Sequence, residues 1–227
     1  MYKRAHIYFS LAILVAFIGF FPSYFSRLGQ TDAIRHFHGL TALAWMLLLV
    51  MQAWLIRQGN RPWHRRLGRS AFVLAPLFIA SGLLVTHSML LGANPFQRAF
   101  GPQLAFLDLV SMIYFGIVVG LAIRHRRNIQ LHARYMASTA VLVLPPAVSR
   151  IMGMGIPGIS SFEASVHVGY FLTELVVLLL IIDDRRMGRV RLPYPMLMAV
   201  LLVQQAGFVL LPHWQPWLDL CKWIGTL

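Results

Sequence analysis

Apolar residues occur along the chain in seven long runs, and short polar stretches separate them. A helix of about 20 apolar residues crosses a bilayer core about 30 Å thick, and each run is close to that length. The runs predict transmembrane helices over residues 7–25, 34–56, 70–91, 104–124, 133–152, 165–182 and 196–211. Gly101-Pro102 is one of the breakers between them, and Pro145-Pro146 predicts a kink inside the fifth helix. We therefore expect an all-α membrane protein, a seven-helix bundle that forms one domain over residues 1–227.

Composition agrees with a membrane protein and excludes a soluble one. Hydrophobic residues make up 58% of the chain and charged residues only 12%, whereas soluble domains carry about 25% charged residues. The net charge of +13 does not indicate nucleic-acid binding, because the basic residues lie in short clusters between the apolar runs. The expected partner is the lipid bilayer, with a homo-oligomer or another membrane protein as a further partner. The single cysteine excludes an intramolecular disulfide.

The distribution of basic residues predicts the orientation of the bundle. Fifteen of the 20 lysines and arginines fall on one side: Lys3, Arg4, Arg57, Arg61, Arg65, Arg66, Arg69, Arg124, Arg126, Arg127, Arg134, Arg185, Arg186, Arg189 and Arg191. The positive-inside rule places this side in the cytoplasm. We expect the N-terminus to be cytoplasmic and the C-terminus periplasmic in a bacterial inner membrane. No small-residue cleavage site follows the first run, so we expect a retained helix and not a signal peptide.

A short motif occurs twice on the cytoplasmic side. Residues 64–70 and 132–138 both read H-x-R-x-x-x-S. Either the two copies open related helical hairpins that form a four-helix core, or they are similar by chance. Two roles are open for these segments: they bind an anion such as lipid phosphate through donors near a helix N-terminus, or they are topology signals in contact with lipid.

Three further histidines lie on the periplasmic side at matching depth. His38, His87 and His167 are predicted within ~8 Å of the outer boundary, and Asp108 lies at a similar depth. Glu163, His167, Tyr170 and Glu174 recur at helical spacing on one face. An ionisable group at membrane depth is a functional candidate, because it costs free energy unless it is paired, hydrated or metal-bound.

Four interpretations of these residues remain open. A transition metal could take His38, His87, Asp108, Glu163 and His167 as ligands. A b-type haem could bind between two of the three histidines. A metal-free polar or substrate site is the third interpretation, and ordinary interfacial residues without a function are the fourth. Tyr170 and Glu174 are the candidate catalytic residues, with Glu174 as the proton-transferring group.

Several segments resemble those of uncharacterised bacterial seven-helix membrane proteins. They are residues 63–69, residues 131–136, and the stretch from Thr173-Glu174-Leu175 to Asp183-Asp184-Arg185-Arg186-Met187-Gly188-Arg189. The resemblance covers most of the chain and implies an architecture without an assigned activity. A more distant likeness to diheme transmembrane cytochromes b would imply paired histidines at both faces. Here His64, His125 and His132 lie in arginine-rich loops, which departs from that pattern.

The leading functional hypothesis is an outward-facing histidine and carboxylate site that binds a metal or haem. Such a site would carry out redox or metal-assisted chemistry on a lipid-soluble substrate such as a quinone. The alternative from another class is a non-enzymatic accessory or assembly subunit of a larger membrane complex. A small transporter that uses Glu174 as its coupling carboxylate is a third hypothesis.

Overall fold

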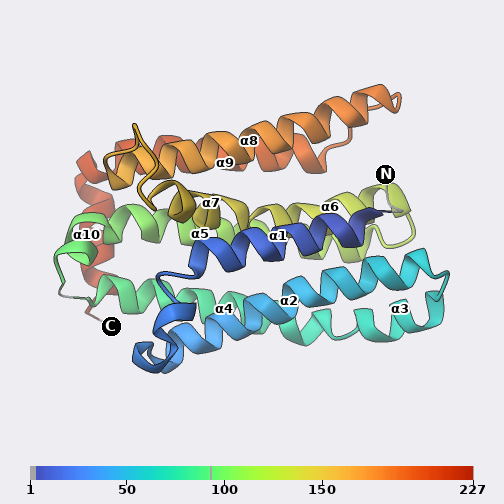
Figure 1. The fold of residues 1–227 in the computed structure, drawn as a ribbon, viewed down its shortest axis with the longest axis horizontal. Coiled ribbons are helices and arrows are strands. Elements are labelled where there is room, and N and C mark those ends of the chain that lie inside the picture. Colours follow the sequence, from blue (N-terminus) through green and yellow to red (C-terminus); the bar gives the residue numbers. More distant parts are fainter. Residues whose placement is uncertain (1–3, 93, 227) are drawn as a thin grey trace.

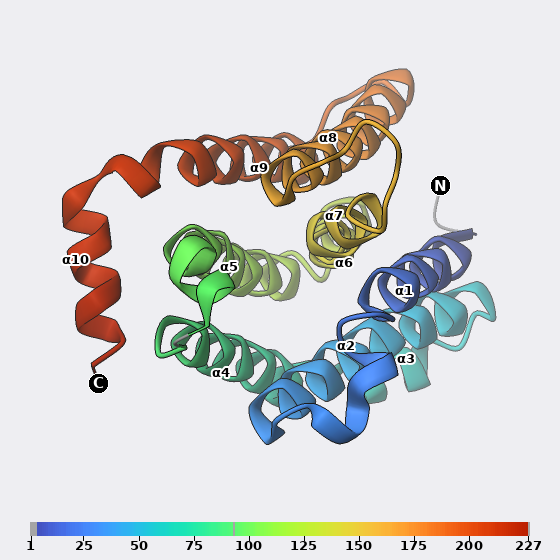
Figure 2. The same ribbon diagram turned by 60° about the vertical axis from the view of Figure 1, so that its left-hand side comes forward.

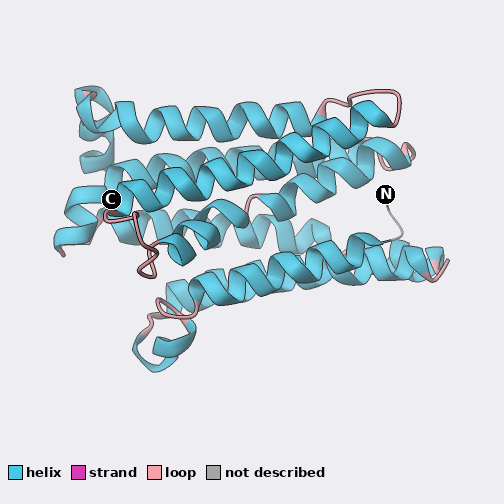
Figure 3. Cartoon of the chain, turned by 45° about the horizontal axis from the view of Figure 1, so that its top comes forward, coloured by secondary structure: helices cyan, strands magenta, loops and turns pink. Residues whose placement is uncertain are grey.

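The computed structural model describes residues 4–92 and 94–226, and within these ranges it contains helices and no strands (Figures 1 and 3). Six helical segments of the described chain are long and apolar enough to cross a membrane. They are α2 (Ala33–Arg57), α4 (Ala71–Leu90), α5 (Pro95–Arg124), the consecutive pair α6 (Ile129–Val141) and α7 (Leu144–Met152), α8 (Phe162–Arg186) and α9 (Pro193–Leu210). The predicted membrane bundle is confirmed at this level.

The remaining helices are shorter. They are α1 (Ala5–Phe20), η2 (Phe25–Gln30), α3 (Arg61–Gly68), η3 (Leu211–His213) and α10 (Gln215–Ile224). Helix α1 is apolar and lies alongside the long helices (Figure 1). Helix α3 connects α2 to α4, and α10 packs across α4 and α5, where the Trp217 indole donates to the Pro102 carbonyl at 3.0 Å.

The packing of the helices forms a closed circuit. Neighbours follow the order α1, α2, α4, α5, α9, α8 and α7, and α7 packs back onto α1 (Figure 2). Helix α6 packs against α5 and α9, and also touches α1 and α2, so it occupies the interior of the circuit. Helix α6 therefore fills the interior in one half of the bundle. In the other half the chain continues as α7, which is itself a member of the circuit.

Polar residues fix where the helices begin. Asn60, Asn94 and Asn128 each precede a helix, and each side-chain oxygen accepts a hydrogen bond from the backbone N–H three residues further on. Asp32 and Ser161 cap α2 and α8 in the same way. These caps satisfy backbone donors that a helix leaves free in its first turn. All five lie at loop positions between apolar runs, where water or lipid head groups end the membrane-spanning segment.

Two predicted helix boundaries need correction. Gly101-Pro102 was expected to end a loop before residue 104, yet α5 begins at Pro95 and continues through Pro102. The Asn94 cap and a proline at the first helical position start the helix earlier. The first predicted helix, 7–25, ends at Phe20, and a turn followed by η2 leads into α2. The Pro145-Pro146 kink is confirmed, because the fifth predicted helix divides into α6 and α7.

The bundle has one arginine-rich end. The loops α2–α3–α4, α5–α6 and α8–α9 lie together there, on the right in Figure 1, while η2 and α10 lie at the opposite end. All of the predicted cytoplasmic basic residues belong to the arginine-rich end except Lys3, which lies outside the described residues. Large apolar side chains such as Val73, Ile113 and Phe171 are exposed along the spans, as expected where lipid covers the surface.

Candidate functional site

Helix α7 is held between α1 and α8 by two glycines. An added Cβ at Gly19 of α1 would lie 2.3 Å from the Ala147 carbonyl oxygen, and one at Gly169 of α8 would lie 2.2 Å from Ser149 Oγ. Only hydrogen at these positions lets the backbones approach so closely, which is how small residues pack membrane helices. The double contact fixes α7, and with it the next residue along the chain, Arg150.

Arg150 carries a positive charge at the end of α7. Its Nη1 donates to the Pro146 carbonyl at 2.8 Å, and its guanidinium lies 4.3 Å from the centroid of the Phe20 ring in α1. Both of these contacts lie within or beside the α1–α7 interface. The Arg150 side chain is exposed, and these two contacts direct its charge.

Asp108 of α5 faces this charge. Its carboxylate interacts electrostatically with Arg150 and accepts a long hydrogen bond of 3.4 Å from Thr86 Oγ1 of α4. Within the described residues, Asp108 and Arg150 do not approach as a direct ion pair. Tyr170 of α8 is buried and interacts electrostatically with both Asp108 and Glu174. Thus side chains from α4, α5, α7 and α8 form one polar cluster in the half of the bundle opposite the arginines.

A second polar chain joins α8 to α9. His167 Nδ1 lies 3.1 Å from Gln205 Oε1, and Gln205 Nε2 donates to Glu174 Oε1 at 3.0 Å. An amide oxygen only accepts, so in this arrangement His167 carries its proton on Nδ1. Gln205 therefore links the predicted proton group to a histidine two turns away on the same helix. Sequence reasoning missed Gln205, because a glutamine in an apolar run carries no charge signal.

The histidine nearest the start of α2 belongs to a third group. His38 Nδ1 lies 3.1 Å from Ser81 Oγ of α4, and Ser81 also bonds Thr41 Oγ1 at 2.9 Å. The His38 ring stacks on Phe78 with centroids 5.2 Å apart. Its neighbour His36 instead contacts Tyr24 and the Leu28 carbonyl, so it holds the η2 segment. His38 is the histidine of this pair that faces the bundle.

The predicted metal ligands do not come together. In the part of the chain that the structure describes, no group of three or more His, Cys, Asp or Glu side chains is arranged to hold a metal ion. His38 is bonded within α2–α4, His167 is bonded across α8–α9, and Asp108 faces α4 and α7. Glu163 is exposed in the first turn of α8, and His87 lies half-buried in the last turn of α4. Matching depth alone could not predict convergence, because the residues belong to separate helix pairs.

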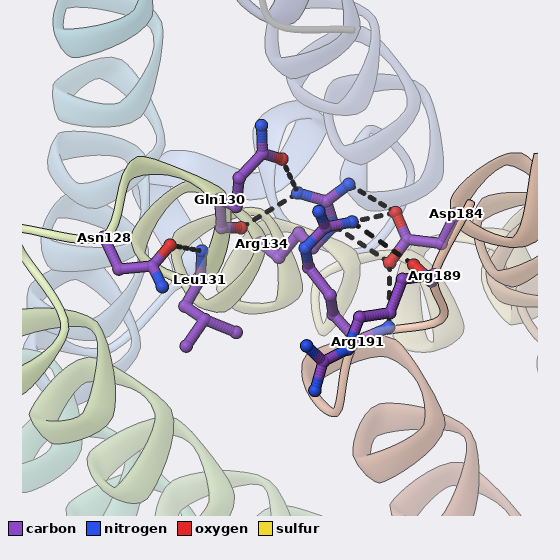
Figure 4. A network of polar contacts seen from close by, with 7 residues as sticks. All are labelled: Asn128, Gln130, Leu131, Arg134, Asp184, Arg189 and Arg191. Atoms are coloured by element: carbon purple, nitrogen blue, oxygen red, sulfur yellow. Dashed lines mark hydrogen bonds and ion pairs between the residues drawn. The ribbon is translucent and has the colours of Figure 1, made fainter. Parts of the chain in front are cut away.

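The arginine-rich end contains a polar network that sequence reasoning assigned differently (Figure 4). Arg134 of α6 and Asp184 of α8 form an ion pair in which both side chains are fully buried. Arg134 Nε donates to the two carboxylate oxygens at 2.8 and 2.9 Å, and its Nη1 donates to Gln130 Oε1 at 2.7 Å. The Arg191 backbone N–H also donates to Asp184. Anion binding had been considered for the second H-x-R segment, but its arginine is committed to Asp184.

The histidines of the two H-x-R segments meet at this end. The rings of His64 and His132 lie edge to face with centroids 6.4 Å apart. His132 Nδ1 donates to the Ala122 carbonyl at 2.8 Å. The pKa of His64 is lowered, chiefly because the ring is partly buried, and a hydrogen bond with the Gln52 backbone opposes this only in part. The two segments differ in their helices, because the first lies on the separate helix α3 and the second lies within α6.

The chain matches no protein-family model, no curated protein and no solved structure. The candidate site consists of the cluster around Asp108, Arg150 and Tyr170, together with the adjoining chain from Glu174 through Gln205 to His167. This arrangement presents two carboxylates, a guanidinium and a phenol at membrane depth. It offers both donors and acceptors to a small polar group.

Proposed function

We propose that this chain is a seven-helix protein of the bacterial inner membrane that binds the polar head of a lipid-soluble substrate, such as a quinone, between α5, α7 and α8. The observation that carries the proposal is the electrostatic grouping of Asp108, Arg150 and Tyr170 from these three helices. Charged groups at membrane depth that face a protein interior are characteristic of substrate and proton pathways. The proposal uses the donors and acceptors of these side chains themselves.

The chemistry of the cluster suits a quinone-type head group. Arg150 and the Tyr170 hydroxyl can donate to carbonyl oxygens, while Asp108 and Glu174 can accept from hydroxyls. Glu174 is hydrogen-bonded to Gln205, which also contacts His167 nearer the start of α8. In this proposal Glu174 exchanges the proton of the bound group, and Tyr170 interacts electrostatically with both carboxylates.

The number of crossings and the orientation belong to the same proposal. Helix α1 contains 16 residues, which span ~24 Å and cross a thin or locally compressed core. With α1 as the first crossing, the arginine-rich end faces the cytoplasm by the positive-inside rule. Reporter fusions test this directly: alkaline phosphatase joined after residue 226 should be active, and the same reporter joined before α1 should be inactive. An inactive C-terminal fusion contradicts the orientation.

Photoaffinity labelling tests the binding proposal. Protein reconstituted in nanodiscs is exposed to an azido-ubiquinone analogue, and the labelled peptides are mapped. We expect saturable labelling on α5, α7 or α8 that Asp108→Asn and Arg150→Gln each reduce by about tenfold, the effect of losing one charged hydrogen bond. The matched controls are Glu163→Gln and Arg98→Gln, which alter exposed charges at the same end. Unsaturable labelling, or equal loss in the controls, contradicts the proposal.

A further inference from the structure

Helix α3 has one face against the bundle and one face away from it. His64, Leu67 and Gly68 are half-buried and recur at the spacing of one helix face. The His64 ring contacts that of His132 in α6, and Gly68 lies against the Gln52 side chain of α2, where an added Cβ would be 3.7 Å from Nε2. These contacts fix the rotation of α3 and therefore the direction of its other side chains.

The outward face of α3 is strongly basic. Arg61, Arg65, Arg66 and Arg69 are all exposed. Arg65, Arg66 and Arg69 line a shallow pocket of about 460 Å³ together with Pro62. Within the described residues, none of these arginines forms an ion pair with a carboxylate. The pocket is thus a site of concentrated positive charge.

The few acidic residues at this end do not neutralise the pocket. Asp183 and Asp184 are the acids of the α8–α9 region. Asp184 is fully buried in its ion pair with Arg134, so its charge is already matched. Among residues 4–92 and 94–226, these three guanidinium groups have no carboxylate counterion. They leave a site that an external anion can fill, and guanidinium forks bind phosphate oxygens in pairs.

Trp63 indicates the depth of this pocket in the membrane. Its side chain is 56% exposed, and the Arg66 guanidinium lies 5.5 Å from its ring centroid. Tryptophan is enriched at the level of the lipid head groups. Because α3 directly connects the spans α2 and α4, it lies at the boundary of the membrane. The arginines beside Trp63 are therefore at the height of lipid phosphates.

We propose that Arg65, Arg66 and Arg69 of α3 form a binding site for the phosphate of an anionic phospholipid in the leaflet at the arginine-rich end. The proposal is independent of the polar site in the opposite half of the bundle. The bound lipid would stabilise the α2–α3–α4 connection, because it replaces mutual repulsion of three cations with attraction to one anion.

Native mass spectrometry of delipidated, full-length protein tests the site. The protein is titrated separately with phosphatidylglycerol and phosphatidylcholine, and the lipid that stays bound is measured. We expect a preference for phosphatidylglycerol that the triple variant R65Q/R66Q/R69Q lowers by about tenfold or more. The matched control R124Q/R126Q/R127Q removes three exposed charges from the same end that do not line the pocket, and it should lower binding by clearly less than the α3 triple variant does.

Further variants and ligands distinguish a specific lipid-binding site from non-specific electrostatic attraction. The variant R65K/R66K/R69K keeps the charge but loses the planar forks, so we expect weakened binding of phosphatidylglycerol. Equal loss in the α3 and control triple variants overturns the proposal, as does the absence of a preference over phosphatidylcholine. Tight binding of inorganic phosphate alone would identify a site for the free anion and would also overturn it. If the glutamine triple variant does not fold, R65Q, R66Q and R69Q are each compared with R126Q, and unchanged binding in all three overturns the proposal.

Discussion

Arg134 of α6 is ion-paired with Asp184 of α8, and neither side chain is accessible to solvent. Gln130 and the Arg191 backbone form further hydrogen bonds with the pair. A buried ion pair adds little net stability when it is complete, but removal of one partner leaves an uncompensated charge. The pair therefore joins the interior helix α6 to the α8–α9 connection.

We predict that Asp184→Asn destabilises the protein by about 3–5 kcal/mol, because the buried Arg134 charge loses its counterion. The measurement is thermal or denaturant unfolding in detergent. The neighbouring Asp183 provides the control, since its side chain is exposed at the same helix end and Asp183→Asn should change stability by less than about 0.5 kcal/mol. Equal effects of the two substitutions would contradict a special role for the buried pair.

The glycine contact between α7 and α8 gives a second prediction. Gly169→Ala places a methyl group against Ser149, whose backbone nitrogen would be 2.6 Å away. We expect a loss of about 1–3 kcal/mol from overpacking. Gly120 of α5 is the control, because a Cβ there meets nothing within 4 Å. Gly120→Ala should leave unfolding unchanged or raise stability slightly, and a tolerated Gly169→Ala would show that α7 can shift.

The α8–α9 chain can be tested by a double-mutant cycle. Gln205→Leu removes the partner of both His167 and Glu174, and Glu174→Leu removes the carboxylate at the other end of one bond. We expect a coupling of about 0.6 kcal/mol between the two changes, the typical strength of a hydrogen bond between membrane helices. The readout is unfolding in a detergent series. Strict additivity of the two effects would show that the contact contributes nothing.

Helix α3 should make stability depend on pH. The pKa of His64 is below its ordinary value in the folded protein, chiefly because of burial. The unfolded state therefore binds a proton more readily, and the contribution of His64 is present above pH ~6.5 and is lost as the pH falls below it. His64→Gln should flatten this acid-side decline in the melting temperature. His213→Gln alters an exposed histidine and should leave the pH profile unchanged.

Much of the fold could be predicted from local patterns. The long apolar runs located the spans, and Pro145-Pro146 correctly indicated the division into α6 and α7. Gly101-Pro102 misled the boundary of α5, because the Asn94 cap and Pro95 begin the helix a full two turns earlier. Proline lacks the backbone N–H that would bond the carbonyl four residues earlier. Whether the helix continues through a proline depends on whether that carbonyl can be solvated.

The candidate site was predicted only in part. Asp108, Tyr170 and Glu174 were singled out as ionisable groups at membrane depth, and the structure puts them within one electrostatic neighbourhood. The positions of Arg150 and Gln205 in this site depend on α7 packing and on α9 lying beside α8. Neither relationship leaves a periodic trace in the sequence, because both join residues that are distant along the chain.

The sequence by itself determined the membrane character, the approximate spans and the separation of basic residues to one end. These follow from length, hydropathy and charge, which are local properties of each segment. The tertiary structure alone decided that the predicted metal ligands separate into different helix pairs, and that Arg134 finds Asp184. Such choices depend on which helices become neighbours and how each is rotated, and these are set by close contacts such as Gly19 with Ala147 and Gly169 with Ser149.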